Sequence, residues 1–156
     1  MTFFSLTLLT KTVAAALSSV SFSVVFGIKK KHLVYATGIS TIAYFVYYTV
    51  LYFEGTLFLA AFLSTALAAF FSEILARVRH APAIVFLLPA VIPTVPGGAI
   101  YYAMRDLLSN NPQGSLENLL VTLKIALGIA GGIVSVSVIF TSLFRKIKKI
   151  KKKNVQ

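Results

Sequence analysis

A dense run of prolines and glycines, PAVIPTVPGGAIYYAMR starting at Pro89, is where this sequence offers the clearest chemistry. Pro89, Pro93 and Pro96 each lack a backbone N–H and clash with the carbonyl four residues earlier, so one continuous helix cannot accommodate all three. Gly97 and Gly98 follow, and glycine adopts backbone angles that other residues resist. The run therefore predicts a broken helix, whose exposed backbone groups are able to bind small charged molecules.

The backbone groups that such a break frees are of two kinds. The first half-helix ends with carbonyls that have lost their donors, at Val85, Pro89 and Ile92, and these suit a cation or an ammonium group. The second half begins with the N–H groups of residues 97–99, at the positive end of a helix dipole, and these suit a carboxylate or another anion. The pattern thus predicts recognition of a small molecule that carries a carboxylate.

The position of the break along its segment places it deep in the membrane. At about 1.5 Å per residue, Pro93 lies about 16 Å beyond Pro82, near the middle of a ~30 Å hydrocarbon layer. Irregular backbone persists there only when it is buried in protein or lines a wet cavity. A proline kink that merely shapes helix packing is the alternative. The predicted substrate-binding residues are those of the break and of one face of the helix after it: Pro89, Pro93, Pro96, Gly97, Gly98, Tyr101 and Arg105.

The composition places the whole chain in a membrane. Of its 156 residues 58% are hydrophobic and 12% charged, and the mean hydropathy is +0.87. This is too apolar for a domain of this size in water. The net charge of +11 is gathered in short clusters between hydrophobic runs, with no motif for nucleic acid. With no cysteine, and with His32 and His80 beside basic residues, we expect no metal site, no cofactor and no enzyme active site.

We predict an all-α, polytopic integral membrane protein that forms a single membrane domain, residues 1–156, with five transmembrane helices. The expected segments are residues 3–28, 33–53, 56–76, 82–106, which is discontinuous at Pro93–Gly98, and 116–144, the last of them capped by Ser115. Small residues in the third segment and a GxxxG pair, Gly128 and Gly132, in the fifth predict close helix contacts.

The basic residues predict the orientation. Twelve of the fifteen Lys and Arg residues lie in residues 29–31, in residues 77–79 and in a basic tail, residues 145–156. Because cytoplasmic loops are enriched in Lys and Arg, we expect a multi-pass protein of the cell membrane with its N-terminus outside and its C-terminus in the cytoplasm. The tail is expected to lie against anionic lipid headgroups.

A few polar residues inside the segments allow two interpretations. Lys11 and Tyr44 either face a transport path or sit at the membrane interface. Glu73 either pairs with Arg77, four residues later, or carries a proton. Asp106 is the other weak candidate for coupling transport to an ion gradient, since no acidic residue lies in the middle of a segment.

The run PAVIPTVPGGAIYYAMRDL resembles the proline-rich PxxxPxxPG signature of the threonine/serine exporter family in its small-subunit, five-helix form. The resemblance carries over Pro89, Pro93, Pro96 and Gly97. It implies a subunit of a secondary exporter for small carboxylate-bearing metabolites, most plausibly threonine and serine, with a dicarboxylate such as succinate as the alternative substrate. A non-transporting structural subunit is the other alternative.

The resemblance also implies a partner, a larger membrane subunit of the same family that is encoded separately or fused. An odd number of segments adds a hypothesis about that partner. A homologous five-helix part inserted the opposite way would create an inverted repeat, an arrangement common among transporters.

Overall fold

The chain folds into helices throughout the part that the computed structural model describes, namely the backbone of residues 2–153 and the side chains of residues 6–142. In chain order the elements are α1 (Thr2–Val25), α2 (Lys30–Tyr52), α3 (Leu57–Arg79), α4 (Ile84–Val91), the 3₁₀ helix η1 (Ile92–Thr94), α5 (Gly97–Leu108) and α6 (Pro112–Lys153). No strand occurs among these residues, and the predicted all-α fold is confirmed.

Four of the helices, α1, α2, α3 and α6, are each long and apolar enough to cross a membrane. The pair formed by α4–η1 and α5 meets the same criterion as a unit and is bent by 48° at its break. The predicted multi-pass fold with a discontinuous fourth segment is therefore confirmed. The number of spans is five when the bent pair crosses as one.

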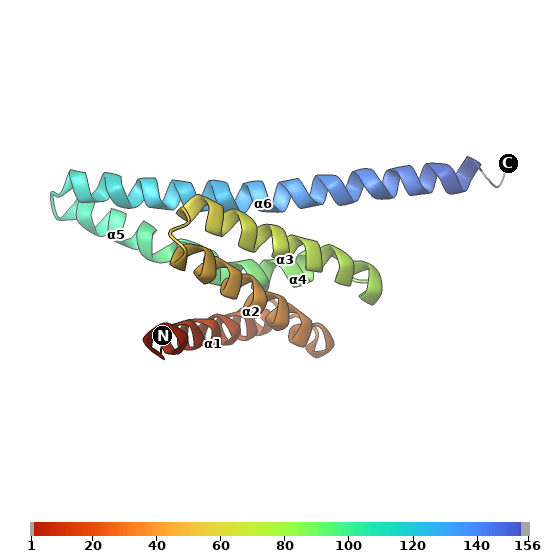
Figure 1. Ribbon diagram of the computed structural model, residues 1–156, viewed down its shortest axis with the longest axis horizontal. Coiled ribbons are helices and arrows are strands. Elements are labelled where there is room, and N and C mark those ends of the chain that lie inside the picture. The colour runs from red at the N-terminus through yellow and green to blue at the C-terminus, as the bar shows by residue number, and fades with distance from the viewer. Residues whose placement is uncertain (1, 154–156) are drawn as a thin grey trace.

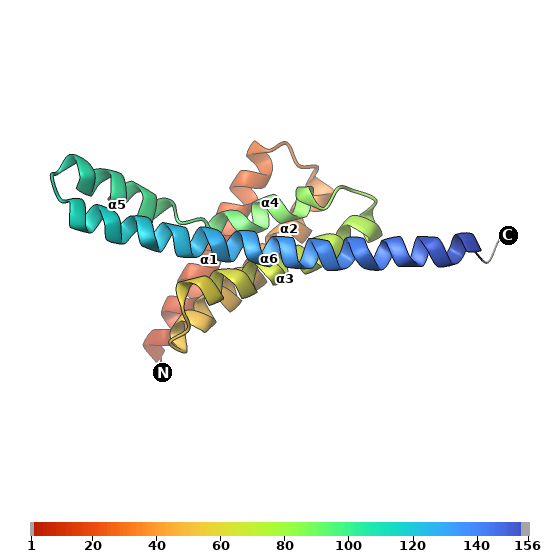
Figure 2. The same cartoon turned by 90° about the horizontal axis from the view of Figure 1, so that it is seen from above.

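The longest helix, α6, runs along the whole molecule, with α5 beside its N-terminal half and α3 beside its middle (Figure 1). α1 lies on the far side of the molecule from α6, and α2 and α4 lie between them (Figures 1 and 2). The hairpin of α5 and the N-terminal part of α6 projects from the other helices (Figure 2). α5 is thus packed on α6 but leaves its other side uncovered.

The contact between α3 and α6 depends on small residues. Gly128 and Gly132 are buried, and a Cβ atom on them would approach the carbonyl oxygens of Phe58 and Phe62 to 2.6 Å and 2.5 Å. Only glycine permits the two backbones to come so close. Two of the α3 residues that meet these glycines, Ala61 and Thr65, are small and buried. The small residues Ser64, Ala68 and Ser72 of α3 are also buried, but Ser64 points to α2, where its hydroxyl donates to the Ala43 carbonyl at 2.8 Å. The predicted GxxxG contact is confirmed.

The half-helix that precedes the break is held in the core. Phe86 of α4 is fully buried, and its ring receives the edge of the His32 ring at 5.3 Å between centroids. The apolar cluster around it comes from α2, α3 and α4: Ile39, Ala43, Ala68, Ala90 and Val91. Burial of this face fixes α4, and hence the position at which the chain breaks.

The start of the last helix differs from the prediction. α6 begins at Pro112 and not at residue 116, and its first turn is capped by Asn111, whose side-chain oxygen accepts a hydrogen bond from the Gly114 N–H at 3.1 Å. Ser115, the predicted cap, is buried inside the helix. The backbone stays helical to Lys153, while the side chains of the basic tail, and its predicted contact with anionic lipid, lie outside the described residues.

Candidate functional site

The break in the fourth segment consists of three different backbone conformations in succession. α4 ends at Val91, and a single 3₁₀ turn carries the chain through Pro93 to Thr94. Val95 is extended (φ −64°, ψ 132°), and Pro96 adopts φ −79°, ψ 50°. These angles, with the Gly97 N–H donating to the Val95 carbonyl at 2.8 Å, define an inverse γ-turn at Pro96. α5 starts directly after it, turned by 48°.

The break frees fewer backbone groups than the proline pattern predicts. The carbonyl of Ile92 accepts the Val95 N–H at 3.0 Å, because the 3₁₀ turn supplies a donor three residues on. The Gly97 N–H is occupied by the γ-turn. The predictions of a free Ile92 carbonyl and a free Gly97 N–H are therefore wrong. Thr94, which is buried, further closes this region by donating its hydroxyl to the Val91 carbonyl at 2.6 Å.

Two backbone donors remain at the start of α5. The N–H of Ile100 donates to the Pro96 carbonyl at 3.1 Å, as expected for a first helical turn. Within the described residues, the N–H groups of Gly98 and Ala99 have no hydrogen-bond partner. Pro96 stands at the cap position and offers no side-chain oxygen to satisfy them. The positive end of the α5 dipole is thus uncapped at the break.

The glycine pair faces open space. A Cβ atom added to Gly97 or Gly98 would meet no other atom within 4 Å. Both residues are exposed, and Val95 just before them is 50% exposed. In a single chain, therefore, nothing in the described part requires glycine at either position for reasons of space.

A cavity of about 320 Å³ lies against the break on its other side, between α1, α2 and η1. Its lining is formed by six residues: Lys11, Ala14, Ala15, Ser18, Tyr44 and Pro93. The ammonium group of Lys11 lies 5.6 Å from the ring centroid of Tyr48, one helical turn beyond Tyr44. The cavity therefore combines one cation, two hydroxyl groups and small residues beside an irregular backbone.

Five of the predicted site residues lie at the break or in the half-helix before it. Pro89 is buried within α4, and Pro93 lines the cavity. Pro96, Gly97 and Gly98 form the turn and the uncapped start of α5.

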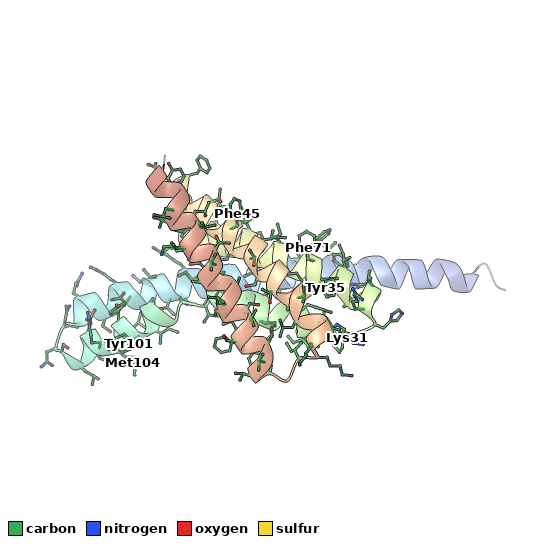
Figure 3. The ribbon with its side chains drawn as sticks, turned by 90° about the horizontal axis from the view of Figure 1, so that it is seen from below. Lys31, Tyr35, Phe45, Phe71, Tyr101 and Met104 are labelled. Carbon is green, nitrogen blue, oxygen red and sulfur yellow. The ribbon has the colours of Figure 1, made fainter. Side chains whose placement is uncertain are left out.

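Tyr101 and Arg105 lie farther along the exposed side of α5 and do not line the cavity. Tyr101 points away from the other helices, as does Met104 next to it (Figure 3). The predicted face of α5 thus exists, but it is turned outward and not toward α1–α4.

The two acidic candidates for ion coupling are both engaged in contacts away from the break. Glu73 forms the predicted ion pair with Arg77, at 2.7 Å. Asp106 is 8% exposed, and its carboxylate accepts hydrogen bonds from Arg105 at 2.8 Å and from Asn118 of α6 at 3.1 Å. It joins the end of α5 to α6. Ten residues of helix separate it from Pro96, about 15 Å at 1.5 Å per residue.

Sequence reasoning favours the membrane interface over a transport path for Lys11 and Tyr44, and it does not single out Ser18. Their relation to Pro93 depends on how α1 and α2 pack on η1, which periodicity does not reveal. The available signal is a lysine preceded by ten uncharged side chains and followed by an apolar helix, since an ionisable residue inside a membrane segment is a candidate functional residue.

Comparison with known proteins agrees with the proline signature. Residues 11–139 match the family model described as Threonine/Serine exporter, ThrE. Comparison with curated proteins and with solved structures gave no significant match. The family match starts at Lys11 and contains the whole break, the cavity and the α3–α6 contact. A helical membrane fold interrupted at this signature, together with a match over most of the length, shows that the chain belongs to the threonine/serine exporter family.

Proposed function

We propose that this chain is one subunit of a secondary exporter for small carboxylate-bearing metabolites, most plausibly threonine and serine. The observation that carries the proposal is the uncapped start of α5, which presents the N–H groups of Gly98 and Ala99 at a break inside a transmembrane segment. A carboxylate is the natural ligand of such a helix end. Family membership supports transport as the role.

The cavity at Pro93 supplies the second element of the proposal. Lys11 provides a positive charge for a carboxylate, and the hydroxyls of Ser18 and Tyr44 provide hydrogen bonds for a polar substrate. From Lys11 to the end of α1 at Val25 the helix runs about 21 Å at 1.5 Å per residue, so the Lys11 backbone lies about 9 Å inside the other face of a ~30 Å layer. In this proposal the substrate moves from one of these two places to the other, that is, between the cavity and the start of α5, past the γ-turn.

A second subunit completes the transporter in this proposal. The glycine pair and the exposed side of α5 lack a covering element in the described chain, which supports contact with the larger membrane subunit. We further propose that the partner has the opposite orientation and that this chain has its N-terminus outside and its C-terminus in the cytoplasm of a cell-membrane protein. The basic loops before α2 and before α4 support that orientation, because both line one cavity and hence lie at one end.

The test is efflux of radiolabelled threonine and serine, and of succinate in a parallel series, from cells that express the chain with its larger subunit. Lys11→Gln is compared with Lys124→Gln, which removes an exposed lysine of α6 outside the cavity. A charged hydrogen bond contributes about 1.5–3 kcal/mol, so we expect Lys11→Gln to raise the substrate concentration for half-maximal efflux roughly ten- to hundredfold. Lys124→Gln should behave as wild type.

Two outcomes would contradict the proposal. Equal efflux with and without this chain, for all three substrates, would remove the transport role and favour a structural subunit. Normal efflux in Lys11→Gln would exclude the cavity from the substrate path, leaving the start of α5 as the remaining site.

A further inference from the structure

A second cavity, of about 360 Å³, lies at the opposite end of α4 from the break, where the α1–α2 and α3–α4 connections meet. Figure 3 shows Lys31 at this end of α2, with Tyr35 farther along the same helix. The cavity is lined by residues of both connections and of the adjoining helix ends: Phe26, Gly27, Ile28, Lys29, Lys31, His32, Arg79, His80, Ala81, Pro82 and Val85.

The charge of this cavity has one sign. Lys29, Lys31 and Arg79 contribute three cations, and none of its described lining residues is acidic. The nearest acidic side chain along α3, Glu73, is already paired with Arg77. All three side chains are exposed to solvent, and an anion bound among them would relieve their mutual repulsion.

Arg79 is held in place without a carboxylate. Its guanidinium carbon lies 4.2 Å from the ring centroid of Tyr35, a distance typical of a cation–π contact. Stacking on the face of a ring restricts the side chain while leaving the N–H groups at the edge of the guanidinium free for hydrogen bonds. This is the geometry in which arginine recognises phosphate.

A buried polar atom at the wall of the cavity is unsatisfied. His32 is 6% exposed, and its Nδ1 has no hydrogen-bond partner in the described part of the chain. Its ring is fixed edge-on against Phe86. Buried polar atoms are nearly always paired in folded proteins, so the unpaired Nδ1 shows that the chain alone does not fully satisfy the polar groups of this region, although the atom itself is too buried to touch a ligand in the cavity.

The start of α2 contributes in the same direction. Lys29 occupies the cap position and no side chain caps the helix, so the N–H groups of Lys30 and Lys31 have no partner in the described chain, whereas the His32 N–H donates to the Lys29 carbonyl at 2.8 Å. A helix N-terminus adds a positive partial charge to the three cations. Positive charge and free backbone donors therefore both favour an anion at one place.

We propose that this cavity binds a phosphate group, either that of an anionic lipid headgroup or inorganic phosphate from solution. Three cations with no counter-charge favour a group that carries more than one negative charge or several acceptor oxygens. Basic pockets between transmembrane helices near the membrane surface commonly hold lipid phosphates. The site is separate from the transport site, and its ligand bridges the α1–α2 and α3–α4 connections.

The test uses the full chain, purified and placed in lipid nanodiscs of phosphatidylcholine alone or with phosphatidylglycerol, and heated with or without inorganic phosphate at matched ionic strength. We expect a rise in melting temperature with phosphatidylglycerol, with phosphate, or with both. A rise with the lipid alone identifies the headgroup as the ligand, and a rise with phosphate in pure phosphatidylcholine identifies the free anion. No rise in either arm, relative to phosphatidylcholine with chloride, overturns the proposal.

The matched variants are Lys31→Gln and Lys30→Gln. Both remove one charge from the same helix start, but only Lys31 lines the cavity. Of the two lysines, only Lys31 is placed to donate a charged hydrogen bond to a phosphate in the cavity, so Lys31→Gln should weaken binding of the effective ligand roughly tenfold and Lys30→Gln should leave it near wild type. Equal weakening in both variants would show a general surface-charge effect and would overturn the site. Adding Arg79→Gln to Lys31→Gln should weaken binding further.

Discussion

Replacement of Gly98 by leucine should change stability and transport in opposite directions. Gly98 lies in the first turn of α5, its φ is not positive, and a Cβ there meets no atom within 4 Å. Glycine is less favourable than alanine in a helix by about 0.5–1 kcal/mol, and leucine is nearly as good as alanine. We therefore expect the isolated Gly98→Leu chain to be as stable as wild type or slightly more stable.

In the assembled exporter the same leucine would occupy space that we assign to the substrate and to the partner subunit. Inserting side-chain atoms into a closely packed contact costs about 1–3 kcal/mol. If that cost falls on the transport cycle, efflux should drop roughly 5- to 150-fold, since about 1.36 kcal/mol corresponds to a factor of ten. The predicted signature is a stable, normally inserted protein that exports poorly.

The control is Gly38→Leu. Gly38 is also an exposed helical glycine with nothing within 4 Å of an added Cβ, but it lies on α2 outside the cavity at the break. Thermal unfolding of the purified chains and efflux of labelled threonine, at equal protein levels, are measured for both variants. The reasoning fails if Gly98→Leu exports as well as Gly38→Leu, or if both lose export equally.

Three further predictions concern the frame that holds the site. Gly132→Leu should destabilise the purified chain by about 1–3 kcal/mol, because the leucine side chain would collide with the backbone of α3 at Phe62. An unchanged melting temperature would disprove the close contact. Asp106→Ala should destabilise the α5–α6 hairpin by about 1–3 kcal/mol, since Arg105 and Asn118 lose their acceptor. Asp106→Asn keeps one acceptor and should cost less; loss of gradient-driven export in a fully stable Asp106→Asn would instead assign proton coupling to this residue. Because the chain has no native cysteine, single cysteines can map its orientation. Phe53→Cys and Gln113→Cys should react with an impermeant maleimide added outside cells, and Lys30→Cys should react only after permeabilisation. The reverse pattern of labelling would show the opposite topology.

The positions of the helices and the existence of the break could be predicted because each depends on local sequence. Uninterrupted apolar length gives the spans, and prolines separated by two or three residues rule out a continuous helix whatever surrounds them. The contact face of α6 can likewise be predicted from Gly128 and Gly132, since the GxxxG spacing places both glycines on one face. That the helix packed on this face is α3 follows only from the structure.

The details of the break were not predictable by counting lost donors. That argument assumes an α-helix up to each proline, whereas the chain tightens into a 3₁₀ turn and then a γ-turn, so Ile92 and Gly97 find partners three and two residues away. The start of α6 was missed for a different reason. Asn111 followed by Pro112 is a cap followed by a proline at the first helical position, a signal that the length of the apolar run does not contain.

The cavity at Pro93 and the basic cavity depend on tertiary structure alone. Lys11 and Tyr44 meet Pro93 only because α1 and α2 both pack against η1. Likewise, Arg79 reaches Tyr35 only because α3 returns to the end at which α2 begins. Antiparallel helices can pack against each other in many registers, and no pattern within one sequence selects among these registers.

The contrast between two pairs of glycines supports the view that this chain is part of a larger transporter. Gly128 and Gly132 are covered by the backbone of α3, so their lack of a side chain serves a contact within the chain. Gly97 and Gly98 have neither a positive φ nor a neighbour that a side chain would touch. Glycine at a helical position lowers the stability of the helix relative to alanine, and no close contact within the described chain compensates for that loss. We propose that these glycines admit something from outside close to the backbone, and that at a break with free N–H groups it is a substrate held against a second subunit.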